Sequence, residues 1–101
     1  MARTSETKIE RLTEVREMLA EARRHVGQDV FVGLVVEPIS LLARCDSACA
    51  DSLRDVLTHA ICLRQVDPDA TRGAIDYVRG RLAWILGRLE RDARRSEGGD
   101  L

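Results

Sequence analysis

Two segments of this chain carry apolar residues at alternating spacings of three and four, which is typical of helices that pack along one stripe. The first set is Leu12, Val15, Leu19, Ala22 and Val26, and the second is Ile75, Val78, Leu82, Ile85 and Leu89. Charged residues fill most of the other positions. The spacing therefore predicts two long helices, over about residues 5 to 26 and 70 to 95, whose stripes could pack antiparallel around a middle helix.

Residues that commonly end helices flank these segments. Gly27 is placed to take the left-handed backbone conformation that ends many helices. Before the last segment, Asp67-Pro68-Asp69 interrupts the helical pattern, and Asp69 is a candidate for the next helix cap. Beyond Arg95 the periodic pattern stops. We therefore expect one helical domain over residues 1 to 95 and a flexible tail over residues 96 to 101.

The segment from Val30 to Val36 is a run of seven uncharged residues that does not alternate. A strand here would need a partner strand from another copy, because no second strand pattern occurs in the chain. The helical alternative has Asp29 as its cap and Pro38 as a kink or break. We favour the helix, because it agrees with the class of the rest of the chain.

Apolar residues from Pro38 onward follow one narrow stripe at 3.6 residues per turn, and proline suits the first position of a helix. The stripe consists of Leu42, Cys45, Cys49, Leu53, Val56, Ala60 and Leu63. This pattern predicts one long middle helix, with a bend near Asp46 and Ser47 as an alternative. The expected fold is an all-α bundle of three long helices, or of four if Val30 to Val36 is helical.

The composition of the 101 residues, 45% hydrophobic and 33% charged, is that of one small globular domain. Small folds often leave apolar surface exposed and bury it by associating with another copy, so we expect a homodimer or another homo-oligomer. The net charge of −1 indicates no general attraction to nucleic acid or to an anionic membrane. No segment has the length and apolarity of a membrane span or secretory leader, so we expect a cytoplasmic protein with reduced cysteines.

Gly73, Gly80 and Gly87 recur every seven residues in the last segment, and Tyr77 and Trp84 recur at the same interval between them. At 100° per residue these five residues, the Gly/Tyr/Trp face, centre opposite the apolar stripe. A glycine inside a helix costs about 1 kcal/mol relative to alanine, so three of them indicate close approach by another group. We predict that this face binds a second copy or a protein partner. The alternative is a central helix covered on both faces within one chain.

Cys45, Cys49, His59 and Cys62 are residue types that bind zinc. One uninterrupted helix would separate the two pairs by about 20 Å. They could meet if the helix breaks near Asp51, or if two copies cross antiparallel. We favour the interpretation that the cysteines are small core residues, since buried free cysteines usually are, and that no cofactor binds; a zinc site is the alternative.

Arg81, Arg88, Arg91 and Arg95 flank the Trp84 side of the last segment, and arginines beside an exposed aromatic can bind nucleic acid. A helix also favours basic residues in its last turns, which is a simpler explanation. No phosphate-binding loop, nucleophile motif or metalloprotease motif occurs. The sequence therefore favours a non-enzymatic interaction or regulatory module.

Overall fold

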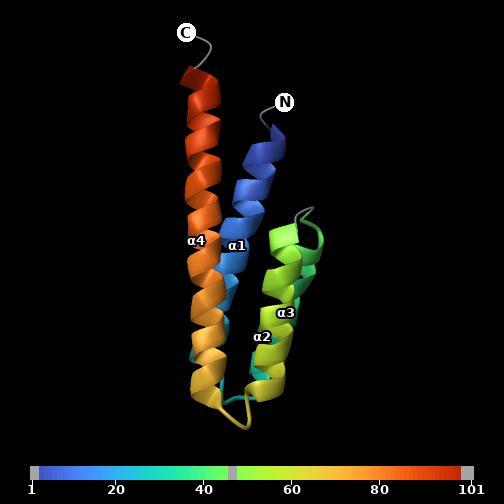
Figure 1. Ribbon diagram of the computed structural model, residues 1–101. Helices are drawn as coiled ribbons and strands as arrows, with labels where there is room; N and C mark the ends of the chain where they lie inside the picture. Colours follow the sequence, from blue (N-terminus) through green and yellow to red (C-terminus); the bar gives the residue numbers. More distant parts are fainter. Residues whose placement is uncertain (1–2, 46–47, 99–101) are drawn as a thin grey trace.

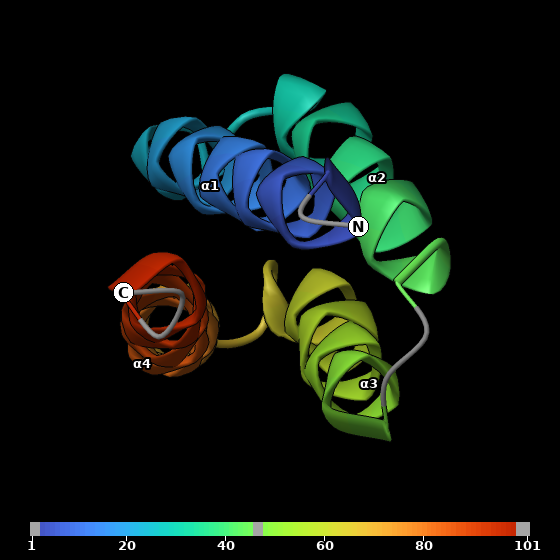
Figure 2. The ribbon, with the colours of Figure 1, turned by 90° about the horizontal axis from the view of Figure 1, so that it is seen from above.

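The computed structural model describes residues 3–45 and 48–98, and the side chains of residues 8–45 and 50–95. The chain forms four helices: α1 (Arg3–Arg24), α2 (Val30–Ala43), α3 (Ala48–Leu63) and α4 (Pro68–Gly98). Successive helices run in opposite directions (Figure 1). Seen from above, α1 and α2 form one layer, and α4 and α3 form the other (Figure 2). The fold is thus an all-α, up-down-up-down bundle, and the uncharged run after Asp29 is helical, as predicted.

The two predicted apolar stripes form much of the core. All five residues of the first stripe are buried: four lie on α1, and Val26 continues the stripe past the end of that helix. The first three stripe residues of α4 are fully buried, whereas Ile85 and Leu89 are half-buried. Leu86 of α4, which the predicted stripe did not include, is buried as well. Most of the remaining core comes from α2 and α3, with Phe31 and Leu57 among its largest fully buried side chains.

Polar contacts set the register of the long α4 helix against its neighbours. The Nε of Arg23 on α1 lies 2.8 Å from a carboxylate oxygen of Asp76. The hydroxyl of Thr71, fully buried, donates to the carbonyl of Ala60 on α3 over 3.3 Å. Since α4 packs antiparallel to both α1 and α3, the predicted antiparallel packing of the two stripes is confirmed (Figure 1).

The prediction of one long middle helix is wrong. The chain turns back after Ala43, and α3 runs antiparallel to α2 (Figure 1). Pro38 lies inside α2 with its ring buried, and does not begin a helix. The stripe was misleading because parts of it are buried on both sides of the reversal, Leu42 and Cys45 before it and Leu53 and Ala60 after it, whereas Leu63 is exposed. Asp46 and Ser47, where a bend was considered, lie outside the described residues.

The connection between α1 and α2 differs from the prediction made for Gly27. No described residue, Gly27 included, has a positive φ. The chain instead passes through tight hydrogen-bonded turns, in which the amide of Gln28 donates to the carbonyl of His25 (2.9 Å) and the amide of Phe31 donates to that of Gln28 (3.1 Å). These turns satisfy backbone groups that a helix end leaves open, so no left-handed residue is needed.

The start and the end of α4 are also corrected. Asp67, not Asp69, caps the helix, because its Oδ1 accepts a hydrogen bond from the amide of Ala70 over 3.0 Å. Pro68 takes the first helical position, where its missing N–H costs nothing. The helix runs to Gly98, past the expected end at Arg95, and residues 99–101 lie outside the described range.

The helices differ in length: α1 and α4 have 22 and 31 residues, whereas α2 and α3 have 14 and 16. The excess lies at one end, so α1 and α4 project past the connection between α2 and α3 (Figure 1). This gives an elongated molecule with extents of 55 × 21 × 20 Å. At the step where the two short helices end, the core is covered from fewer sides.

Candidate interaction face and cavity

The structure places the Gly/Tyr/Trp face on the outside of the bundle. Tyr77 and Trp84 are 56% and 52% exposed. A Cβ atom added to Gly73, Gly80 or Gly87 would meet nothing within 4 Å. Within the described residues, therefore, nothing packs closely over this face, and the alternative of a helix covered on both faces by its own chain does not hold.

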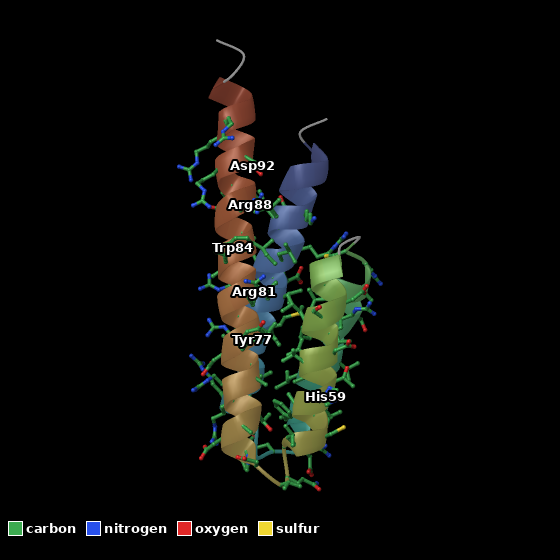
Figure 3. The ribbon with its side chains drawn as sticks, in the orientation of Figure 1. His59, Tyr77, Arg81, Trp84, Arg88 and Asp92 are labelled. Atoms are coloured by element: carbon green, nitrogen blue, oxygen red, sulfur yellow. The ribbon has the colours of Figure 1, made fainter. Side chains whose placement is uncertain are left out.

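Trp84 lies between two of the four arginines that flank its side of α4. The guanidinium carbons of Arg81 and Arg88 lie 5.2 and 5.6 Å from the centroid of its ring, which is cation–π geometry. Tyr77, Arg81, Trp84 and Arg88 follow one another along α4 (Figure 3). The other two of the four arginines, Arg91 and Arg95, are exposed further along the helix. Two cationic groups therefore lie beside the exposed Trp84 ring.

A cavity of about 320 Å³ lies where α2 ends and α3 begins, at the level beyond which only α1 and α4 continue. Its apolar wall is built by Leu12 of α1, by Leu42, Cys45, Ala50 and Leu53 at the α2–α3 end, and by Leu82, Ile85 and Leu89 of α4. The remaining lining residues are charged or aromatic, and we call them the rim: Lys8, Trp84, Arg88 and Asp92. The sequence contained no signal for this cavity, because its position depends on the reversal after α2.

The candidate zinc residues are not brought together within the described part of the chain. Cys45 is buried and its thiol donates weakly to the carbonyl of Leu41 (3.7 Å). Cys62 and His59 are exposed near the other end of α3. The side chain of Cys49 lies outside the described residues.

The helix break that would join the two zinc pairs does not occur, because α3 is continuous from Ala48 to Leu63. His59 instead has its Nδ1 at 2.9 Å from the carbonyl oxygen of Asp55, one turn earlier. The described side chains include no group of three or more His, Cys, Asp or Glu that could hold a metal ion.

His25, just after α1, has hydrogen-bond acceptors at both ring nitrogens. Its Nδ1 lies 2.8 Å from the side-chain oxygen of Gln28, and its Nε2 lies 3.0 Å from a carboxylate oxygen of Glu21. Only the doubly protonated ring donates to both. The hydrogen bond to Gln28, followed by that to Glu21, therefore raises the pKa of His25 above its ordinary value.

Comparison with known proteins adds no relative: no family model, curated protein or solved structure matches this chain. None of the described helices combines the length and the apolarity needed to cross a bilayer.

Proposed function

We propose that this chain is a non-enzymatic helical module that self-associates as a homodimer through the Gly/Tyr/Trp face of α4. The observation that carries the proposal is that two half-exposed aromatics share this face with three glycines over which nothing in the described chain packs. Tyr and Trp are enriched at the energetic centres of protein interfaces. Glycines allow a second helix to approach closely.

The charges on this face favour an antiparallel pair of α4 helices. Asp69 comes eleven residues before Gly80 and Arg91 eleven residues after it, so both lie about three turns from the central glycine and on its side of the helix. A two-fold axis at Gly80 would place Arg91 of one copy opposite Asp69 of the other. A parallel pair would oppose like charges instead. Among the described residues Asp69 pairs with Arg72 (2.7 Å), in a surface ion pair of little strength.

The same axis makes the aromatic part of the face self-complementary. It places Gly87 of one copy opposite Gly73 of its partner, and Trp84 beside Tyr77. Each large ring would then lie against a helix surface lowered by glycine. This fit uses every residue of the face, which neither the zinc nor the nucleic-acid hypothesis does.

The direct test is sedimentation equilibrium or native mass spectrometry over a range of concentrations for the wild type and Gly80→Leu. The leucine meets open space in the monomer but occupies the contact in the dimer. We expect the dissociation constant to rise by at least about fivefold, since overpacking costs about 1–3 kcal/mol. Gly33→Leu on α2, a second helical glycine with open space around it, is the matched control and should leave the dissociation constant unchanged. A wild type that stays monomeric throughout refutes the proposal.

A charge exchange tests the orientation. Arg91→Glu alone should weaken the dimer, because it opposes two carboxylates across the axis. Adding Asp69→Lys to the same chain should restore association with the charges reversed. Failure of the second change to rescue the first would exclude the antiparallel pair.

A further inference from the structure

The cavity at the step between short and long helices has the features of a binding site for one class of small molecule. We propose that it binds a free medium-chain aliphatic carboxylate, with the alkyl chain inside and the carboxylate at the rim. The site meets the Gly/Tyr/Trp face only at Trp84 and does not depend on dimerisation.

The size and wall of the cavity select the body of the ligand. Its volume of about 320 Å³ is at the small end of the range of about 300–1,000 Å³ for small-molecule sites. Among the described wall residues the one polar side-chain group is the thiol of Cys45, and it already points to the carbonyl of Leu41. A hydroxyl or amide inside would therefore stay without a partner, which is costly. This disfavours sugars and nucleotides and favours an alkyl chain.

The charges at the rim select the head group. The rim contains two cationic side chains, Lys8 of α1 and Arg88 of α4, and one carboxylate, Asp92, so it carries one net positive charge. None of the three forms an ion pair within the described part of the chain. An arginine can bind a carboxylate through two parallel hydrogen bonds. A cationic head group would meet two like charges.

The position of Trp84 supplies an internal reporter. It is the only tryptophan of the chain and lies at the rim, next to Arg88. Figure 3 shows Trp84, Arg88 and Asp92 in succession on the part of α4 that extends past the N-terminal end of α3. A carboxylate that engages Arg88 changes the surroundings of this ring, so its fluorescence should follow binding.

The experiment is a fluorescence titration with hexanoate, octanoate and decanoate, below their micelle-forming concentrations. Burial of each methylene is worth about 0.8 kcal/mol, so the dissociation constant should fall by about fourfold per methylene until the cavity is full. Decylammonium, which has the same chain and the opposite charge, should bind at least about tenfold more weakly than decanoate.

Variants locate the ligand. Ala50→Phe fills the cavity and should abolish saturable binding, with the helical circular dichroism retained. Asp92→Asn removes the one carboxylate of the rim and should tighten decanoate binding severalfold. Arg88→Gln should weaken it, whereas Arg81→Gln should not, because Arg81 contacts the same ring but does not line the cavity.

Several outcomes would overturn the proposal: no saturable response at any chain length, equal binding of decylammonium, or unchanged binding to Ala50→Phe. If Ala50→Phe does not fold, the Arg88/Arg81 pair and Asp92→Asn still decide. A response to phosphatidylglycerol vesicles without one to free decanoate would indicate a membrane lipid instead. Gly80→Leu should bind decanoate as the wild type does, so failure of the dimer and failure of this site are distinguishable.

Discussion

Replacing the three face glycines by alanine should stabilise the isolated chain and at the same time weaken its self-association. Each glycine lies inside α4, where it costs about 1 kcal/mol relative to alanine. The new Cβ meets nothing within 4 Å, so no steric cost offsets the gain. Neighbouring positions are about 10 Å apart along the helix, far enough for additive effects. The triple variant should therefore gain about 2–3 kcal/mol.

The gain should be measured on the monomer, because association adds its own stabilisation at higher concentration. For a domain of this size about 1 kcal/mol raises Tm by about 4–8 °C, so the triple variant should melt roughly 10–20 °C higher in circular dichroism at the lowest usable concentration. Gly33→Ala on α2 is the control for the gain in helix propensity alone. It should raise Tm without changing the dissociation constant.

Opposite signs in the two measurements make this prediction sharp. A triple variant that is less stable than the wild type as a monomer would mean that the glycines contact something within the chain. A variant that is more stable but associates as the wild type does would mean that the glycines are not the contact. The second result would refute the proposed dimer even if the chain is dimeric.

Further predictions concern the core, the cap and the pH dependence. Leu57→Ala removes a fully buried side chain and should lower the free energy of unfolding in urea by about 2–5 kcal/mol; a loss below 1 kcal/mol would contradict the core packing. Asp67→Ala removes the α4 cap and should lower the free energy of unfolding by about 0.5–2 kcal/mol, more than Asp69→Ala does. A larger loss for Asp69→Ala would indicate that Asp69 is the cap. Because the folded pKa of His25 is raised, its contribution is complete below the unfolded pKa of about 6.5 and is lost as pH rises through the folded pKa. The Tm of the wild type should therefore fall slightly over that window relative to His25→Gln, and parallel pH profiles would contradict the assignment.

The long helices α1 and α4 were predictable because a stripe of spacing three and four directly reports the face that a helix buries. The same phase argument located the outer face of α4, since the direction opposite a buried stripe is exposed at the edge of a bundle. Only the ends were misplaced. Asp67 and Asp69 both suit a cap, and it is the position of Pro68 as the first helical residue that decides between them.

The reversal between α2 and α3 was not predictable, for a specific geometric reason. Leu42 and Leu53 are eleven residues apart, which is very nearly three helical turns, so the two helices bury their stripes in the phase of one continuous helix. The chain between Pro38 and Leu63 contains neither glycine nor a further proline to mark a turn. The reversal follows from tertiary burial, because a folded pair covers the stripes of α1 and α4 and a single long helix would leave half of its own stripe exposed.

The two proposals differ in how much of the fold they require. The Gly/Tyr/Trp face depends only on the phase of α4, so it would be present in any bundle that buries the stripe from Ile75 to Leu89. The cavity exists because α2 and α3 are shorter than α1 and α4. Its wall combines residues of four helices, and the periodic pattern of the sequence does not determine how these helices are aligned with one another. Decanoate binding therefore tests the reversal and the relative lengths of the helices, whereas self-association tests one helix surface.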